Sequence, residues 1–209
     1  SAQKRVKENK MAAKFGTSGL RGLVGDLTDG TAAAHARAFA RHLKTSGMAQ
    51  PGASVFIGRD MRASSPEIAA QCASAIFDEG LEPVDCGVLP TPALALHAMA
   101  RNAAALMITG SHIPDDRNGV KFYRPDGEVD KNDELAISSL APDCGVEHAP
   151  APQLMRDQSL EANAAFVERY RGFAPDGLLQ GLRIGIYEHS SAASRCLAEI
   201  LNAAGVDVV

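Results

Sequence analysis

Residues 104–123 read AALMITGSHIPDDRNGVKFY and join an apolar run, a polar loop and a second apolar run. The first run predicts a strand over residues 104–109, because a short apolar run of this kind is typical of a strand covered by helices. Asn118 and Gly119 form a strong turn signal, which predicts that a strand over residues 119–123 folds back beside the first. A polar loop therefore lies between the ends of two neighbouring strands.

Strands and helices alternate along the chain around this stretch. Short apolar runs predict the strands, and apolar residues at spacings of three and four predict amphipathic helices. The expected strands cover residues 54–58, 82–87 and 104–109. The expected helices cover residues 31–46, 91–101 and 131–140, with one more between Ser65 and Gly80. This alternation predicts an α/β fold in which helices enclose a mixed, mainly parallel sheet.

The second part of the chain starts another unit of the same kind. Prolines at 142, 150 and 152 are typical of a linker, and a helix, a strand, a helix and a strand are expected after it. The chain stops on a strand, and proteins usually avoid unpaired strand edges, so we expect a fragment of a longer protein. The expected segments are an N-terminal extension (1–13), a first domain (14–145), a linker (146–158) and an incomplete second domain (159–209).

Composition and charge exclude several classes of protein. With 45% hydrophobic and 22% charged residues, the chain is globular rather than disordered. It has no apolar run of roughly 18 residues, so we expect a cytoplasmic protein without a membrane partner. The net charge of −4 divides into +4 over residues 1–14 and −8 over the rest, which argues against a nucleic-acid partner.

The cysteines and histidines do not form a recognisable metal or disulfide pattern. The four cysteines are far apart and lack a C-x-x-C pair, so we expect buried, reduced thiols. The six histidines never form H-E-x-x-H, which disfavours a metalloenzyme of that type. A serine hydrolase at Ser111 is disfavoured as well, because Ile113 stands where a G-x-S-x-G elbow requires glycine.

Two glycine-rich or arginine-rich loops are candidate phosphate sites. In FGTSGLRG, residues 15–22, Thr17, Ser18 and Arg21 can donate hydrogen bonds to an anion, although glycine-rich loops of this kind are more commonly simple turns. In GRDMRASS, residues 58–65, the arginines follow a strand at the edge where α/β proteins bind ligands. They can hold phosphate, or pair with loop carboxylates and keep the loop in shape.

The loop after the strand over residues 104–109 carries the strongest chemical candidate. A serine hydroxyl such as that of Ser111 needs a neighbouring ammonium or imidazole in order to react. The returning strand can bring Lys121 near Ser111, while His112 can serve the substrate instead, because adjacent side chains of an extended chain point apart. The alternative interpretation makes Ser111 a turn residue and Lys121 a solvated strand lysine.

The three segments FGTSGLRG, GRDMRASS and TGSHIPDDRNGVKFY, in this order and at these separations, resemble the first domain of the α-D-phosphohexomutases. This is the phosphomannomutase and phosphoglucomutase superfamily. The resemblance runs over residues 15–140, and residues 182–209 look like the beginning of that family's second domain. TGSHIP, in place of T-A-S-H-N-P, is most similar to phosphomannomutases of the sugar-nucleotide and O-antigen type.

The resemblance implies an enzyme that interconverts hexose 1-phosphate and hexose 6-phosphate, with mannose or glucose phosphate as substrate. Ser111 matches the serine that is phosphorylated in the resting enzyme, and a bisphosphorylated sugar is the intermediate. Hexose 1,6-bisphosphate is therefore the expected activator. By the same match, the other catalytic residues are His112, Lys121 and Arg21. The substrate- and phosphate-binding residues are Thr17, Ser18, Arg59 and Asn118.

The resemblance also implies Mg²⁺ and further domains. In the family, Mg²⁺ bridges the phosphoserine and three aspartates of a D-G-D-G-D-R loop, which this sequence lacks. Ser111, through a phosphate oxygen, is the one metal ligand that we assign. The expected partners are a hexose phosphate and the remaining domains of the same protein, so the isolated chain should be nearly inactive. A sugar-phosphate binding or interaction module without catalysis is the alternative.

Overall fold

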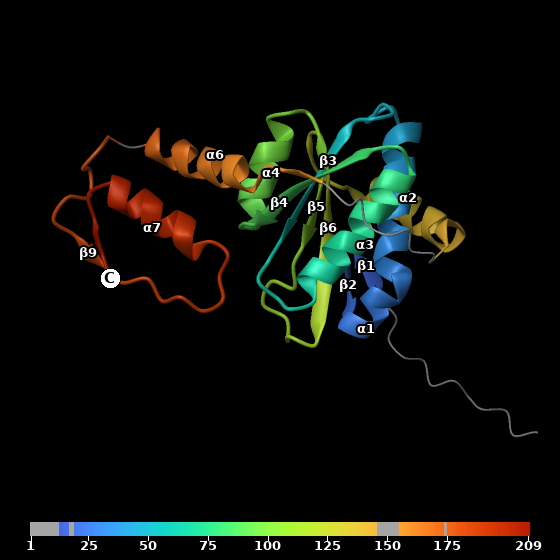
Figure 1. The fold of residues 1–209 in the computed structure, drawn as a ribbon, viewed down its shortest axis with the longest axis horizontal. Helices are drawn as coiled ribbons and strands as arrows, with labels where there is room; N and C mark the ends of the chain where they lie inside the picture. The colour runs from blue at the N-terminus through green and yellow to red at the C-terminus, as the bar shows by residue number, and fades with distance from the viewer. Residues whose placement is uncertain (1–12, 17–18, 146–154, 174) are drawn as a thin grey trace, which may run out of the picture.

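A mixed sheet between two layers of helices forms the body of the protein (Figure 1). The computed structural model describes residues 13–16, 19–145, 155–173 and 175–209. The strands follow the order β1-β2-β6-β5-β3-β4-β8, and β7 pairs with β6. They are β1 (Lys14–Gly16), β2 (Gly19–Leu23), β3 (Ser54–Arg59), β4 (Glu82–Val88), β5 (Ala104–Ile108), β6 (Arg117–Arg124), β7 (Gly127–Glu128) and β8 (Arg156–Asp157).

The sheet divides into a parallel half and an antiparallel half. Strands β5, β3, β4 and β8 run parallel, whereas β6, β2 and β1 add to the other side of β5 as antiparallel neighbours. The expected α/β fold with a mixed sheet is therefore confirmed. The boundary falls between β5 and β6, at the polar loop that the sequence placed between these two strands.

Helices cover both faces of the sheet, and alternate residues of each strand enter two separate cores. On β5, Leu106 and Ile108 join one core, while Ala105 and Met107 join the other. The first core lies under α2 (Ala32–Thr45), α3 (Ser65–Asp78) and α5 (Lys131–Leu140). The second lies under α4 (Thr91–Met99) and α6 (Ser159–Arg171). Shorter helices are α1 (Val24–Asp26), a π-helix over Leu27–Thr31 and a 3₁₀-helix over Ala141–Cys144.

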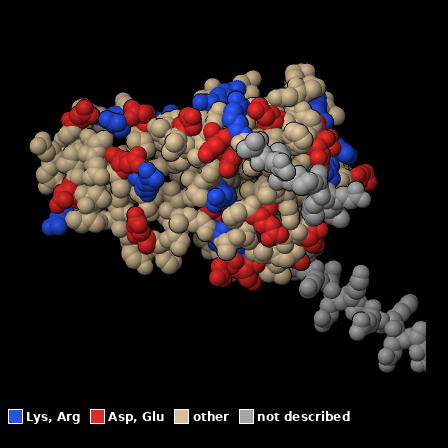
Figure 2. Space-filling view, in the orientation of Figure 1, with Lys and Arg blue, Asp and Glu red and all other residues tan. Residues whose placement is uncertain are grey.

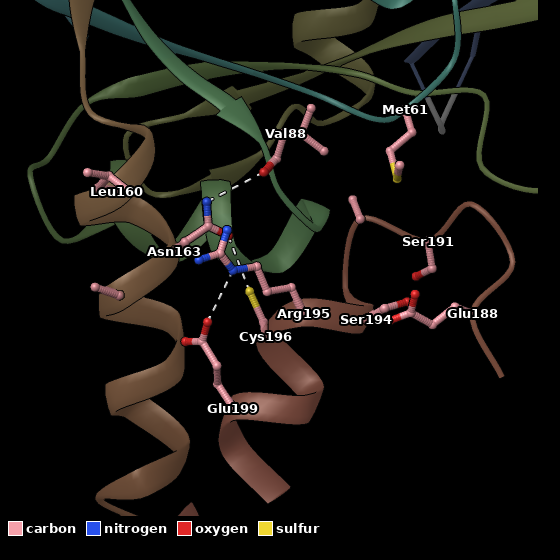
Figure 3. A pocket seen from close by; sticks show the side chains of 12 residues that line it. Met61, Val88, Leu160, Asn163, Glu188, Ser191, Ser194, Arg195, Cys196 and Glu199 are labelled. Carbon is pink, nitrogen blue, oxygen red and sulfur yellow. Dashed lines mark hydrogen bonds and ion pairs between the residues drawn. The ribbon is translucent and has the colours of Figure 1, made fainter. Parts of the chain in front are cut away.

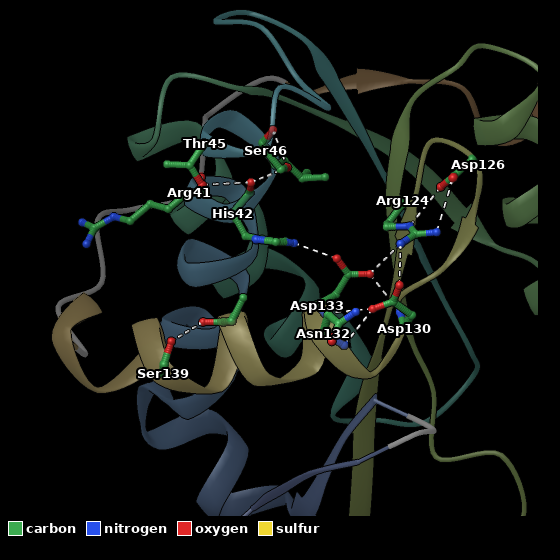
Figure 4. A network of polar contacts seen from close by, with 12 residues as sticks. Arg41, His42, Thr45, Ser46, Arg124, Asp126, Asp130, Asn132, Asp133 and Ser139 are labelled. Carbon is green, nitrogen blue, oxygen red and sulfur yellow. Dashed lines mark hydrogen bonds and ion pairs between the residues drawn. The ribbon is translucent and has the colours of Figure 1, made fainter.

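A polar network fixes α5 against the sheet and against α2 (Figure 4). The buried Asp133 carboxylate accepts hydrogen bonds from His42 Nε2 on α2, at 2.7 Å, and from Arg124 Nη1 on β6, at 2.9 Å. Asp130 begins the helix, because its side chain accepts the backbone N–H groups of Asn132 and Asp133. Hydrogen bonds from the Asp133 and Asn132 N–H groups hold the pKa of Asp130 below its usual value.

Acidic and basic side chains are interspersed over the face shown in Figure 2.

The glycine-rich segment at the start of the chain differs from the expected loop. It forms the hairpin strands β1 and β2, and Arg21 lies opposite Gly119 of β6. Glycine is required at position 19, where φ is +86° and an added Cβ would overlap the carbonyl oxygen of Val120. Residues 1–12, 17 and 18 lie outside the described residues, and the expected extension over 1–13 falls almost wholly within that part.

The turn expected at Asn118 and Gly119 is wrong. Both residues lie inside β6 and pair with β2, and the chain reverses earlier, in the loop over residues 110–116. Two backbone hydrogen bonds close this loop, from Ile113 N–H to the Gly110 carbonyl and from Arg117 N–H to the Pro114 carbonyl. Tertiary pairing with β2 has overridden the local preference of the Asn-Gly pair.

The expected linker over residues 146–158 needs correction at its C-terminal end. Residues 146–154 lie outside the described part, but Arg156 and Asp157 form β8, in register with Val84 and Asp85 of β4. The helix α6, which we expected to open the second domain at residue 159, packs on α4 and contributes to the second core. These elements therefore extend the first sheet and its cover.

The remaining residues form a small strand-helix-strand unit. It comprises β9 (Arg183–Ile184), α7 (Ser194–Ala203) and β10 (Asp207–Val208), in the expected order but with shorter strands. Strands β9 and β10 are parallel, and α7 lies beside α6 (Figure 1). Among the described residues, no helix combines the length and apolar character needed to cross a bilayer.

Candidate functional site

Ser111 lies at the end of β5 in a backbone conformation that serine rarely adopts. Its φ is +54°, in the left-handed region, and its side chain is exposed. The Ser111 N–H donates to Thr109 Oγ1 at 3.0 Å, and Thr109 N–H donates to the Gly119 carbonyl at 3.0 Å. The hydroxyl is thus presented on a fixed turn rather than on a free loop.

Arg62 holds this loop from the opposite side. Its guanidinium donates to four backbone carbonyls, which belong to Pro114 (2.8 Å), Arg117 (3.1 Å), Ile113 (2.6 Å) and Ser111 (3.3 Å). A planar group with five N–H donors suits such a set of acceptors. Of the two roles open to Arg62 in the sequence, the structure therefore shows the one that keeps the loop in shape.

Asp60 fixes both Arg62 and the loop. One carboxylate oxygen accepts Ser65 Oγ at 2.6 Å and the Arg62 N–H at 3.0 Å. The other accepts the Gly110 N–H at 3.0 Å and lies 3.4 Å from Arg62 Nε. An added Cβ at position 110 would overlap the Arg62 guanidinium, so the Arg62 side chain would have to shift to admit a larger residue. Sequence reasoning missed Asp60 as a site residue, and its strand-end position was the signal available.

His112 is closer to Ser111 than the sequence suggested. His112 Nδ1 lies 3.2 Å from Ser111 Oγ, within hydrogen-bond distance. We expected adjacent side chains to point apart, as in an extended chain, and that expectation is wrong here. The left-handed φ of Ser111 turns the backbone, which lets the two neighbouring side chains meet.

Lys121 makes no hydrogen bond to Ser111 among the described residues. It pairs in register with Met107 of β5, four residues before Ser111, and its Nζ lies 4.0 Å from a carboxylate oxygen of Glu128. The antiparallel pairing runs β6 away from the loop, so each residue after Gly119 lies further from Ser111. The expected neighbourhood of Lys121 and Ser111 stays a prediction.

Arg21 and Arg59 remain available for a ligand. Arg21 crosses Gly119, where its Cγ lies 3.1 Å from the position of an added Cβ, and the Thr109 carbonyl oxygen is equally close to that position. Arg59 ends β3. Within the described ranges, neither guanidinium has a carboxylate within 4.0 Å or a hydrogen-bond acceptor. Thr17 and Ser18, the other expected phosphate ligands, lie outside those ranges.

Asn118 does not fit its expected role as a substrate ligand. The residue is fully buried, and its Nδ2 donates to the hydroxyls of Ser64 at 2.8 Å and Ser65 at 3.0 Å. Its Oδ1 accepts the Gly119 N–H at 2.8 Å. With its polar atoms occupied and no exposure, Asn118 joins β6 to the start of α3 and has no access to a ligand.

Ser111 and His112 open onto a cavity of about 440 Å³. Residues far apart in the sequence line it, and they are Asp60, Met61, Arg62, Ser111, His112, Ile113, Asp115, His189 and Ser190. A larger cavity of about 580 Å³ adjoins it at Met61 and extends between α6 and the loop before α7 (Figure 3). Ser111 lines the smaller cavity and is not among the residues that line the larger one, so the smaller cavity is the candidate site for chemistry at Ser111.

The cysteines do not compete with Ser111 as nucleophiles. All four are free and buried, as the sequence led us to expect. Burial raises the pKa of Cys72 and of Cys86 to about 12, so both thiols stay protonated near neutral pH. Burial also raises the pKa of Tyr123 above its usual value. The Ser111 hydroxyl, in contrast, is exposed and has the imidazole of His112 at hydrogen-bond distance.

A complete site for Mg²⁺ is not formed by the described residues. No three His, Cys, Asp or Glu side chains gather there in an arrangement that could hold a metal ion. Asp60, whose carboxylate accepts the Gly110 N–H of the Ser111 loop, is already paired with Arg62 and a serine hydroxyl. These residues alone do not fit a divalent cation, which requires several oxygen ligands.

Comparisons with known proteins identify the family to which the chain is similar. The family described as "Phosphoglucomutase/phosphomannomutase, alpha/beta/alpha domain I" matches residues 12–143. The chain is 51% identical to the phosphomannomutase of Sinorhizobium fredii over 203 residues, which cover 95% of this chain and 43% of that protein. It is 40% identical to the phosphomannomutase of Salmonella muenchen over 201 residues, or 96% of this chain and 41% of that protein.

A solved structure shows the same fold. The crystal structure of a phosphoglucomutase/phosphomannomutase family protein from Burkholderia thailandensis superimposes with a TM-score of 0.76 at 24% identity. The superposition covers 93% of this chain and 43% of that one. The chain therefore belongs to the phosphoglucomutase/phosphomannomutase family of phosphohexomutases and contains its first α/β/α domain. It spans less than half the length of the curated relatives that it matches.

Proposed function

We propose that Ser111 carries the phosphoryl group in a mutase that interconverts hexose 1-phosphate and hexose 6-phosphate, with mannose or glucose phosphate as substrate. The observation that carries this proposal is the exposed Ser111 hydroxyl, held on a left-handed turn 3.2 Å from His112 Nδ1 and open to a cavity. The two phosphomannomutases reported above support the hexose phosphate as substrate class.

The proposed cycle starts from the phosphorylated serine. As the bond between phosphorus and Ser111 Oγ breaks, a free hydroxyl of the hexose monophosphate bonds to the phosphorus. The proton that this hydroxyl releases to solvent is balanced by the proton that Ser111 Oγ takes up. His112 donates the proton that Ser111 Oγ takes up, because His112 Nδ1 is within hydrogen-bond distance of that oxygen. The product is a hexose 1,6-bisphosphate, which turns over in the cavity. Its other phosphoryl group returns to Ser111, so free bisphosphate is also an activator.

Charge on the transferred group must be neutralised, because phosphoryl transfer depends on positioning and electrostatic stabilisation. Arg21 and Arg59, which lack carboxylate partners in the described structure, supply guanidinium groups for phosphate oxygens. Mg²⁺ belongs to the proposal only through a phosphate oxygen on Ser111. Its further ligands would come from other parts of the protein. Lys121 keeps its proposed role in proton transfer and charge stabilisation near Ser111.

The activity of the whole protein is part of the proposal as well. Because the chain spans less than half of its relatives, we propose that it acts with further domains, in the cytoplasm, and that the isolated 209 residues are nearly inactive. A chain that turned over mannose 1-phosphate by itself at an ordinary enzymatic rate would contradict this part of the proposal.

The direct test compares wild type with Ser111→Ala in the native full-length protein that carries this sequence. A mutase loses turnover of mannose 1-phosphate and glucose 1-phosphate with this change. A sugar-phosphate binding module keeps its affinity for the ligand, measured by calorimetry, and shows no turnover in either form. The second result would replace the mutase by the binding module.

A further inference from the structure

Thr109 directly follows β5 and links the Ser111 turn to the sheet. The residue is buried, and its N–H donates to the Gly119 carbonyl of β6 at 3.0 Å, which fixes its backbone. Its Oγ1 accepts the N–H of Ser111, two residues further along, at 3.0 Å. A hydroxyl in this position stabilises a local turn, because it takes the place of a backbone acceptor.

Hydrogen bonds hold the Ser111 backbone on both sides. The Asp60 carboxylate accepts the N–H of Gly110 at 3.0 Å, and Thr109 Oγ1 accepts the N–H of Ser111. The Ser111 carbonyl accepts a bond from Arg62 Nη2 at 3.3 Å. Asp60 and Arg62 also bond several other groups of the two loops. Within the part of the chain that the structure describes, Thr109 Oγ1 bonds only to the Ser111 N–H.

The strained backbone of Ser111 makes the Thr109 bond important for the position of the hydroxyl. A φ of +54° costs a serine free energy, and such a conformation persists only where its surroundings determine it. One hydrogen bond between neutral groups changes an equilibrium of this kind about fivefold. Without the bond, the turn can relax toward negative φ, and Ser111 Oγ then leaves its place 3.2 Å from His112 Nδ1.

We propose that Thr109 is a positioning residue for phosphoryl transfer and acts through the backbone of Ser111. The inference rests on the proposed function and adds a residue that is not among those lining the cavity. The Thr109 hydroxyl sets the fraction of molecules in which Ser111 Oγ is presented to the sugar and to His112. Loss of this hydroxyl should lower kcat and leave KM nearly unchanged, because the groups that touch the substrate stay in place.

The test measures kcat and KM of Thr109→Val in the native full-length protein, with mannose 1-phosphate and glucose 1-phosphate and with saturating glucose 1,6-bisphosphate. Valine keeps the branched shape of threonine and lacks the hydroxyl. The kcat should fall about tenfold, and KM should change by less than about twofold. Thr109→Ser keeps the hydroxyl and should recover most of kcat, whereas Thr109→Ala should not.

The matched control is Thr45→Val at the end of α2. This change removes an exposed hydroxyl that donates to the Arg41 carbonyl at 3.0 Å, away from the residues that line the cavity. It should leave kcat and KM as in the wild type.

Hydrogen exchange gives a readout that does not depend on activity. The amide of Ser111 should exchange faster in Thr109→Val than in Thr109→Ser, because only serine retains the acceptor. The amides of β5 should exchange at equal rates in the two variants. Faster exchange throughout β5 in Thr109→Val would instead indicate a general loss of stability and would overturn the inference.

The kinetic outcomes separate the inference from the proposed function. If the wild type is active and Thr109→Val has the kcat of Thr45→Val, the inference is overturned while the mutase assignment stands. A higher KM at constant kcat, or an equal loss of kcat in Thr109→Ser and Thr109→Val, would overturn it as well. If the wild type shows neither turnover nor a phosphoserine, the proposed function fails, and this inference with it.

Discussion

Arg62 and Arg59 lie three residues apart and make different contributions to the molecule. Arg62 donates four hydrogen bonds to the Ser111 loop, whereas Arg59 has no such partner in the described ranges. Arg62→Ala should lower the free energy of unfolding by about 2 kcal/mol, since it leaves several carbonyls without their charged donor. Arg59→Ala should change it by less than about 0.5 kcal/mol.

Urea unfolding of the two variants and of the wild type measures this difference. Arg62→Lys is the further control, because a lysine cannot present the planar set of donors that reaches several carbonyls. It should resemble Arg62→Ala more than the wild type. Equal stability of Arg59→Ala and Arg62→Ala would show that Arg62 does not hold the loop.

Residue chemistry was partly readable from the sequence. Ser111 was expected in the loop after a strand, and the structure shows it there with an exposed side chain. Its contact with His112 was not expected. The function of Arg62 was not readable, because its acceptors are 49 to 55 residues further along the chain. Burial of Asn118 was equally hidden, since it depends on the pairing of β6 with β2.

His97 on α4 couples the stability of this layer to pH. It is buried, its Nε2 lies 2.8 Å from Gln158 Oε1, and its Nδ1 has no hydrogen-bond partner in the described part of the chain. Nε2 therefore donates, and a proton on Nδ1 would be a buried, unpaired donor. Burial accordingly lowers the pKa of His97 below its usual 6.5, despite the opposing effect of the hydrogen bond that His97 donates to Gln158.

Because the pKa of His97 is lower in the folded chain than in the unfolded chain, the protein loses stability as the pH falls. Above pH 6.5 the imidazole is neutral in both the folded and the unfolded chain, and its contribution to stability is fully present. As the pH falls below 6.5, the unfolded chain binds the proton first, so stability decreases by up to about 1.4 kcal/mol per pH unit for this one group. His35 also has a lowered pKa from burial, so the comparison needs a variant that retains it.

Chemical unfolding of wild type and His97→Gln at pH 7.5 and at pH 5.5 supplies that comparison. The wild type should lose more stability between the two pH values than His97→Gln does, because His35 is common to both. A pH dependence that is the same in both proteins would mean that His97 is accessible to protons in the folded state.

Because α6 packs on α4 and β4, we predict that α6 folds together with the first domain. Phe166 is 8% exposed and lies in the core under α4, whereas Phe173, beyond the end of the same helix, is 89% exposed. Phe166→Ala should cost about 3 kcal/mol, and Phe173→Ala almost nothing. Hydrogen exchange of the β4 amides should speed up in Phe166→Ala, because α6 packs over that part of the sheet. Unchanged protection of β4 would assign α6 to a separate unit.

Elements with local signals were predicted well, and those that depend on distant pairing were not. The helix expected over residues 31–46 is α2, at Ala32–Thr45, because its apolar face is visible in its own periodicity. The pairing of β8 with β4 has no such signal, since two residues pair with a strand about 70 positions earlier. For the same reason β2 was expected to be a loop.

At the scale of the whole molecule, the fold places two loops from distant parts of the chain around one cavity. One follows β5 and carries Ser111, and the other precedes α7 and carries His189. The family of the first domain was visible in three short segments, but the approach of the second loop was not, because it depends on packing of α7 beside α6.

The central claim is that Ser111 carries a phosphoryl group, and one measurement tests it directly. The protein is purified from its native cells, its intact mass is recorded, and the peptides that cover residues 109–121 are mapped. The account predicts a species far heavier than 21.9 kDa that carries one phosphoryl group on Ser111. A native protein of 21.9 kDa without phosphate on Ser111 would contradict it and favour a binding module.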